Sequence, residues 1–225
     1  MSVEITTRDC SLLSDGELDA MAELVASSEV NLDFGYLSKA REEWVLVTEV
    51  KVDGRLRGFS FYTLERIGGT PAIIIGALVV ERGPQARETL YRVREGQFKK
   101  ALLAFPDEDV LMGSKLLDVG AFEIFEDLED IVPKPGHKPT GEERAWARRL
   151  ARRYGSENRV DDRTFIFSGT GEITGYSGYE PAVRSSVYAD FADFFTPLES
   201  QKNDSLIAFG WIMAEELAKF VATDD

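Results

Sequence analysis

The junction between a strongly apolar run and a helix-forming one is the stretch of this sequence best suited to chemistry. It reads AIIIGALVVERGPQARETLYRVREGQ (residues 72–97), with Arg82 and Arg87 on either side of Pro84. Helix N-termini that follow strands often bind phosphate, because their free N–H groups and the helix dipole favour an anion. Nearby guanidinium groups strengthen that binding. The stretch predicts either a nucleotide- or coenzyme-binding turn, or a plain strand-to-helix link with ordinary surface arginines, since its turn has almost no glycine.

Other reactive side chains are few and stand apart. The one histidine, His137, lies in the loop-like stretch PKPGHKPTG without a second His or Cys to complete a metal site. The one cysteine, Cys10, has no basic partner near it in the sequence, and we interpret it as a small residue packed beside the first helix. We therefore expect no metal and no thiol nucleophile.

Length and charge narrow the class of protein and its partners. The chain has 225 residues, 44% hydrophobic and 29% charged, as in an ordinary globular protein. Its formal net charge of −14 repels nucleic-acid phosphates and anionic lipid, so neither nucleic acid nor membrane is an expected partner. The longest apolar run, PAIIIGALVV, is too short to cross a bilayer. With one cysteine and no export segment, a cytoplasmic location is expected.

The elements before the junction predict a sheet. Residues 3–8 form a short strand by pattern, Ser14 can cap a following amphipathic helix, and residues 31–42 have a helical tendency. Three β-rich runs then follow, separated by Asp53-Gly54 and by the glycine pair at 68–69. Because such pairs supply the positive φ of tight turns, the runs predict a three-strand antiparallel meander.

The elements after the junction predict a crossover. Pro84 suits the first turn of a helix that continues to about residue 104, although Gly96 interrupts its pattern. A strand at 109–117 and a helix at 120–131 follow. The passage from strand through helix to strand predicts a parallel pair beside the meander.

The last third begins with a proline-rich linker and a capped basic helix. Thr140 and Glu143 form a capping-box pattern for EERAWARRLARRYG. Its arginines either bind phosphate or RNA, or pair with acidic residues of this acidic chain, and we favour the pairing. A strand (RTFIFSG), a glycine-rich turn (GTGEITG), a short aromatic helix and a final strand, helix or both are expected after it.

The order of these elements over residues 3–132 resembles the GNAT superfamily of acyl-CoA-dependent N-acyltransferases. The stretches VDGRLRGFSFYTL and IIIGALVVERGPQARET carry the resemblance, and PKPGHKPTGEERAWARRLARRYG is similar to a C-terminal extension in an actinobacterial GNAT-like group. The resemblance implies an α/β (α+β) fold, a mixed central sheet flanked by helices with an appended C-terminal α/β region. It divides the chain into a GNAT-like domain, 1–133, and an extension packed on it, 134–225.

The resemblance also implies an acyl-CoA co-substrate. In that family the turn before the helix carries Arg/Gln-x-x-Gly-x-Gly/Ala, and here Gln85 heads the pattern while Glu88 stands where a glycine is usual. A second register with Arg92 at the head displaces Gly96 by one position and fits no better. The fourth and fifth strands are expected to splay around the acyl-pantetheine arm. The residues expected to bind the coenzyme are Leu78, Val79, Val80, Arg82, Gln85, Ala86, Arg87 and Thr89.

Catalysis in that family needs a base for the acceptor amine and often a tyrosine for the leaving thiolate. The resemblance assigns the base to Glu81 at the end of the central strand, with Glu49 and Tyr62 on neighbouring strands facing the same cleft. Each is also the kind of polar residue that any strand carries on its exposed side. Phe122 or Phe125 replaces the usual tyrosine, so water or another residue must protonate the thiolate.

Three functions follow from this reading. The first is an acyl-CoA-dependent N-acyltransferase for a small amine or an amino-acid-like acceptor, and a homodimer is compatible with it. The second is a non-catalytic GNAT-like scaffold that binds a protein partner or a metabolite, favoured by the missing glycine. The third replaces the coenzyme by an acyl carrier protein, for which the arginine stripe of residues 144–153 is the only support.

Overall fold

The chain forms a mixed sheet with helices on both faces, which confirms the predicted α/β class. The structure is a computed structural model that describes residues 2–26, 32–171, 176–178 and 186–221. The strands run in the order β1-β2-β3-β4-β8-β5-β9-β6, and β7 pairs with β9. Their bounds are β1 Val3–Asp9, β2 Leu46–Val52, β3 Arg55–Ile67, β4 Thr70–Val80, β5 Val110–Leu116, β6 Glu129–Val132, β7 Ile166–Phe167, β8 Tyr176–Gly178 and β9 Ser205–Ile212.

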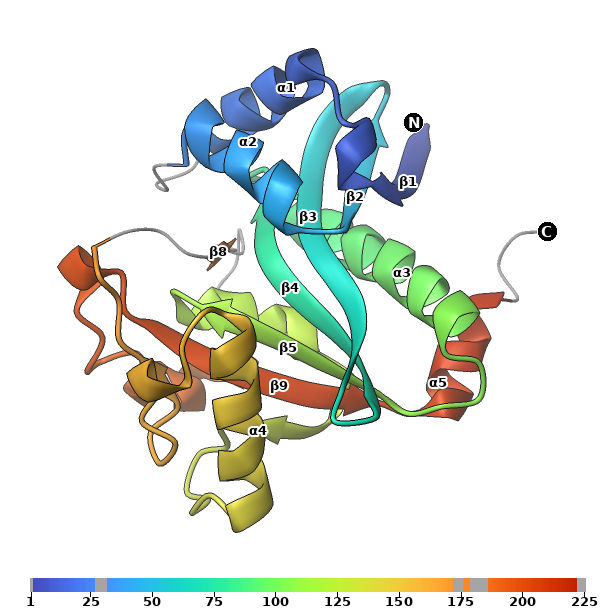
Figure 1. Cartoon of the computed structure of the whole chain (residues 1–225). Helices are drawn as coiled ribbons and strands as arrows, with labels where there is room; N and C mark the ends of the chain where they lie inside the picture. The colour runs from blue at the N-terminus through green and yellow to red at the C-terminus, as the bar shows by residue number, and fades with distance from the viewer. Residues whose placement is uncertain (1, 27–31, 172–175, 179–185, 222–225) are drawn as a thin grey trace.

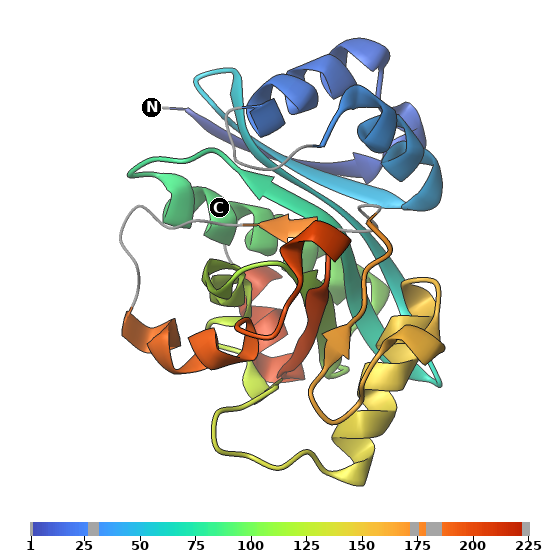
Figure 2. The ribbon, with the colours of Figure 1, turned by 90° about the vertical axis from the view of Figure 1, so that its left-hand side faces the viewer.

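Figure 2 shows α1, α2 and α4 on one side of the sheet and α3 on the other. The α-helices are α1 Asp15–Ala26, α2 Phe34–Glu43, α3 Ala86–Ala104, α4 Gly141–Arg153 and α5 Ala214–Leu217. Short 3-10 helices connect them: η1 Cys10–Leu12, η2 Val119–Phe125, η3 Glu157–Arg159, η4 Ser186–Phe194, η5 Ser200–Lys202 and η6 Ala218–Val221. Among the described residues, no helix is long and apolar enough to span a bilayer.

The predicted meander is confirmed. β2, β3 and β4 pair antiparallel in chain order, and β1 adds to the outer edge of β2. Asp53 (φ 49°) and Gly54 (φ 79°) make the first turn, while the glycines at 68 and 69 make the second with φ of 62° and 94°. Positive φ at all four positions explains why these pairs mark the turns.

Helix α3 approaches the sheet closely at two glycines. A Cβ atom at Gly96 would lie 2.7 Å from Thr48 Cγ2, and one at Gly58 would lie 2.8 Å from Thr89 Cγ2. Both separations are shorter than carbon atoms tolerate. Gly96, which weakens the helix by propensity, therefore lets α3 rest directly on β1 and β2.

The predicted helix at 120–131 is wrong. The segment forms η2 and then β6, which pairs antiparallel with β9. Asp118 caps η2 by accepting a hydrogen bond from the Ala121 N–H at 3.1 Å. Asp127 and Asp130 then take positive φ, 67° and 47°, a backbone conformation that ends a right-handed helix.

The sheet extends into the last third of the chain. β9 lies between β5 and β6 and is antiparallel to both, and α5 with η6 follows it. The final segment is thus a strand and then a helix, as one of the sequence alternatives has it. The division at residue 133 into a domain and an extension stays a prediction, although one sheet joins both parts.

Candidate functional site

The most unusual feature of the sheet is the separation of β4 from β5. The two strands pair in parallel, as predicted, over residues 72–74 and 111–113 only. The β3–β4 register then shifts between Phe61 and Tyr62, which leaves Gly76 as the extra residue of a bulge. Beyond it the strands part like the arms of a V, and β8 lies between them (Figure 1). We call the space between residues 77–79 and Leu116 the β4–β5 gap.

The backbone at the β4 side of the gap pairs with β8. Residues 77, 78 and 79 of β4 face residues 176, 177 and 178 of β8 in parallel register, and Leu116 of β5 faces Ser177. Leu78, Val79 and Val80 are all buried. These three residues therefore lie at the edge of the gap or just beyond it, and their role in coenzyme binding stays a prediction.

The first turn of α3 follows directly on the end of β4. Gln85 is the N-cap, and its side chain makes no capping hydrogen bond. Ala86 is buried and donates its N–H to the Gly83 carbonyl at 3.1 Å, while Thr89 is buried against β3. The exposed Glu88 lies 3.8 Å from Arg92 one turn further on. Glu88 thus pairs along the helix.

Arg82 and Arg87 are both exposed, one before and one inside the first turn of α3. Arg82 is exposed on the turn after β4. The Arg87 guanidinium lies 2.7 Å from a carboxylate oxygen of Glu126, and its Nε donates to the Tyr91 hydroxyl at 3.0 Å. Tyr91 in turn donates to Glu126. Arg82 and Arg87 both stay candidates for phosphate recognition, and the Arg87 guanidinium would have to be shared with Glu126.

The proposed base, Glu81, lies immediately after β4. It accepts hydrogen bonds from Arg55 and Arg57 of β3, and its N–H donates to the Arg57 carbonyl at 2.7 Å. Its side chain is partly exposed. Glu81 is therefore held at the end of β4, two residues beyond Val79, the last residue that pairs with β8.

The expectation that Glu49 and Tyr62 share one cleft is wrong. Glu49 is 2% exposed and lies 2.6 Å from Arg8, which also binds Glu17 of α1. Tyr62 of β3 pairs with Leu46 of β2, and Leu46 lies an odd number of positions from Glu49 along β2. Cross-strand partners point to the same face, so Glu49 and Tyr62 point to opposite faces.

Tyr62 lies deep on the face that α3 covers. The Thr48 hydroxyl donates to its phenolic oxygen at 3.3 Å, and burial raises the pKa of Tyr62 to about 12. The phenol is completely buried. Its catalytic role stays a prediction, as do those of Glu49 and Glu81.

Sequence reasoning missed a buried lysine on β5. Lys115 is 3% exposed, and its Nζ lies 5.0 Å from the ring centre of Tyr154 and 4.9 Å from that of Phe167. Burial, together with the positive charge of Arg159, lowers the pKa of Lys115 to about 7. The sequence signal that could have identified it is a lysine within the apolar run VLMGSKLL.

Replacing Lys115 by methionine is expected to change how stability depends on pH. The pKa of Lys115 is about 7 in the folded chain and 10.5 in its unperturbed state, so the unfolded chain binds more protons between these values. One such group makes the wild type gain up to about 1.4 kcal/mol per pH unit across that interval. Urea unfolding at pH 7, 8 and 9 should show a smaller gain in Lys115→Met. Lys39→Met, at a 67% exposed side chain, should keep the gain, and an equal slope in all three proteins would contradict the assignment.

The arginines of α4 are engaged within the chain, which confirms the pairing that we favoured. Arg144 and Arg148 both bind Asp162, Arg152 binds Glu157, Arg153 lies 2.6 Å from Glu65, and Arg149 stacks on Trp146. His137 lies 2.9 Å from Glu143, which also completes the capping box with Thr140. The stripe therefore offers little support for docking a carrier protein. The turn GTGEITG lies partly outside the described residues.

A surface depression of about 380 Å³ lies along the exposed side of α3. Its charges are mixed, and Arg92 lies 2.9 Å from Glu95 within it. In the part of the chain that the structure describes, no three His, Cys, Asp or Glu side chains are grouped to hold a metal. The depression is lined by Glu88, Tyr91, Arg92, Arg94, Glu95, Asp127 and Phe220.

No family model and no curated protein matches the chain. Among similar solved structures is the aminoglycoside 6′-N-acetyltransferase from Enterococcus faecium, at 16% identity and TM-score 0.41, over 52% of this chain and 64% of that enzyme. ElaA from Escherichia coli matches at 14% and 0.41 over 62% and 95% of the two chains. An acetyltransferase of the GNAT family from Streptococcus pneumoniae matches at 12% and 0.37, over 60% and 90%. The chain spans less than two thirds of the length of the Enterococcus enzyme.

Proposed function

We propose that the chain is an acyl-CoA-dependent N-acyltransferase for a small amine or an amino-acid-like acceptor. The observation that carries the proposal is the parting of β4 from β5. Because the strands part, the backbone of residues 77–79 pairs with an extended chain other than β5. The pantetheine arm of coenzyme A is an extended chain with two amide groups. It can therefore make the kind of backbone hydrogen bonds that a short strand makes there.

The coenzyme phosphates are assigned to the first turn of α3. An arm that follows β4 toward its C-terminal end brings them to this turn, where helix N–H groups favour an anion. Arg82 is exposed beside it, and Gln85 is the N-cap of the helix. Arg87 can bind the phosphates in this proposal only if its ion pair with Glu126 weakens.

Transfer needs one base. The acceptor nitrogen attacks the thioester carbon and loses a proton; the C–N bond forms, the C–S bond breaks and the coenzyme leaves as a thiolate that takes a proton from water. We assign proton removal to Glu81, which its two arginine partners hold at the end of β4. Phe122 and Phe125 are buried and have no proton to give, which supports water as the donor.

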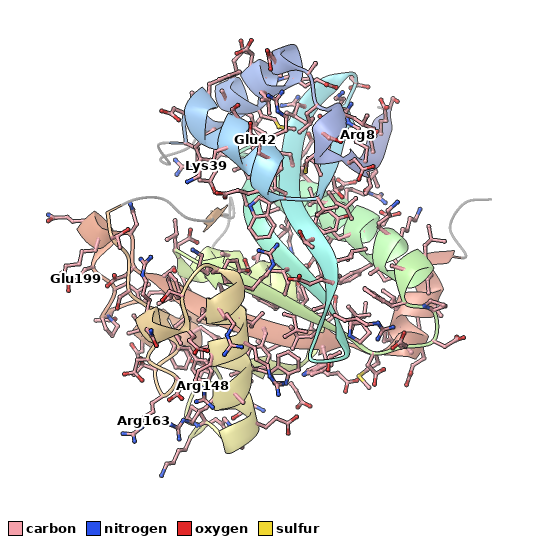
Figure 3. The ribbon with its side chains drawn as sticks, in the orientation of Figure 1. Arg8, Lys39, Glu42, Arg148, Arg163 and Glu199 are labelled. Atoms are coloured by element: carbon pink, nitrogen blue, oxygen red, sulfur yellow. The ribbon has the colours of Figure 1, made fainter. Side chains whose placement is uncertain are left out.

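Acetyl-CoA at millimolar concentration is expected to raise the melting temperature of the wild type in a concentration-dependent manner. The shift should shrink in Arg82→Ala and persist in Arg163→Ala, which removes the same charge from an exposed site beside α4 (Figure 3). The phosphate fragment 3′,5′-ADP should give a smaller shift than acetyl-CoA, because it lacks the arm. A thermal-shift titration measures the melting temperature in each of these cases. The absence of any shift with acetyl-CoA or longer acyl-CoAs would contradict the proposal.

The non-catalytic scaffold remains the second candidate, and one observation favours it. The gap holds β8, and Phe122 packs 4.5 Å from Phe191 and 5.9 Å from Phe195, ring centre to ring centre. This region is therefore filled by the chain itself. Release of coenzyme thiol from acetyl-CoA in the presence of small amines and amino acids separates the two functions, since a scaffold binds without turnover.

A further inference from the structure

We propose that β8 is an internal competitor of the acyl-CoA, so that coenzyme binding requires this strand to leave the β4–β5 gap. The inference rests on the proposed function. It follows from the pairing of residues 77–79 with residues 176–178, at the place that the pantetheine arm requires. The chain thus regulates its own coenzyme site.

Competition follows from the hydrogen-bonding capacity of a strand. Each residue offers one N–H and one C=O, which at the inner edge of β4 can serve a single neighbouring chain. Adjacent chains in a sheet lie about 4.8 Å apart, so a second chain cannot enter beside β8 while β4 and β5 keep their places. The pantetheine arm and β8 are therefore mutually exclusive on residues 77–79.

The pairing of β8 is short, which makes exchange practicable. β8 has three residues, and it faces three residues of β4 and one of β5. The neighbouring strands are anchored far more extensively: β3 and β4 are paired along 58–67 and 70–80, and β5 pairs with β9 along its full length. Loss of β8 therefore leaves the rest of the sheet paired.

The consequence is a conformational equilibrium that precedes binding. If coenzyme binds only the open form, its apparent dissociation constant is the intrinsic one divided by the open fraction. With β8 paired in most molecules, opening the gap permanently should tighten coenzyme binding by about tenfold or more.

Ser177→Pro is the variant that tests this. β8 has a strand on each side, so a proline at its centre removes an N–H that faces one of them and crowds the pairing. The control is Ser200→Pro, at the exposed first position of η5, where proline is well tolerated. Acetyl-CoA affinity is measured by calorimetric titration, and hydrogen exchange at residues 77–79 without ligand reports whether the gap has opened.

The expected result is faster exchange at residues 77–79 in Ser177→Pro and acetyl-CoA binding about tenfold tighter than in the wild type and Ser200→Pro. Equal affinity in all three proteins, with exchange raised, overturns the competition but leaves the proposed function standing. Absence of binding in all three, with exchange raised, overturns both.

A measurement on the wild type alone covers the case in which Ser177→Pro does not fold. Saturating acetyl-CoA should speed hydrogen exchange at residues 176–178, while residues 77–79 stay protected by the bound arm. Bound acetyl-CoA with unchanged exchange at residues 176–178 would overturn the competition.

Discussion

Gly76→Ala is expected to lower the free energy of unfolding by about 2–3 kcal/mol, the upper part of the range for overpacking a well-filled core. A Cβ atom at Gly76 would overlap the indole ring of Trp44. That ring has little room to move, because it lies 6.3 Å from the Tyr154 ring and 5.0 Å from the Arg153 guanidinium. Gly76 is also the bulge residue at which β4 begins to part from β5.

Urea unfolding of Gly76→Ala, Trp44→Ala and the double variant measures this prediction. Removing the indole should relieve the overlap, so the double variant should be less destabilised than the sum of the two single ones. Gly16→Ala is the control, since a Cβ there meets nothing within 4 Å and the residue lies in α1. Additive effects, or a Gly76→Ala variant as stable as the wild type, would show that the contact with Trp44 does not set this position.

Arg8→Met is expected to destabilise the chain by about 2–3 kcal/mol at pH 7, less than breaking a fully buried ion pair costs. The guanidinium forms ion pairs with both Glu17 and Glu49, and Figure 3 shows Arg8 beneath α1. Its side chain is 23% exposed, which screens part of the interaction. Without Arg8, the 2% exposed carboxylate of Glu49 loses its cationic partner.

The cost should shrink as the pH falls. Hydrogen bonds from Ser14 and Arg8 lower the pKa of Glu17 to about 2, against 4.5 unperturbed, so its stabilising effect is complete above about pH 4.5 and is lost on acidification toward 2. Urea unfolding at pH 7 and pH 4 should therefore bring variant and wild type closer together. A cost at pH 7 no larger than that of Arg163→Met, or a cost that does not change with pH, would contradict this account.

The sequence predicts those elements whose signals are local. The turns at Asp53-Gly54 and at residues 68–69 need positive φ, and the capping box of Thr140 and Glu143 is satisfied within one helical turn. η2 and β6 were misread because Asp127 and Asp130 take a left-handed backbone that the polar-apolar pattern of the segment does not reveal. Pairing with β9, over seventy residues later, then makes the segment a strand.

The candidate site was predicted in part for the same reason. An apolar run that is buried on both faces marks β4, so the residues that border the gap could be named from the sequence. The face of a side chain depends on register, which is why Glu49 and Tyr62 were placed together and lie apart. β8 carries no strong strand pattern, and its place beside β4 follows only from the parting of β4 and β5.

In the proposed function, an acyl-CoA binds along β4 in the β4–β5 gap. Titrating acetyl-CoA into ¹⁵N-labelled protein and following each backbone amide tests it most directly. We expect saturable shifts centred on residues 77–79, on the first turn of α3 and on residues 176–178. Shifts confined to the depression on the exposed side of α3, around Arg92 and Glu95, or no shifts at millimolar acetyl-CoA, would contradict it.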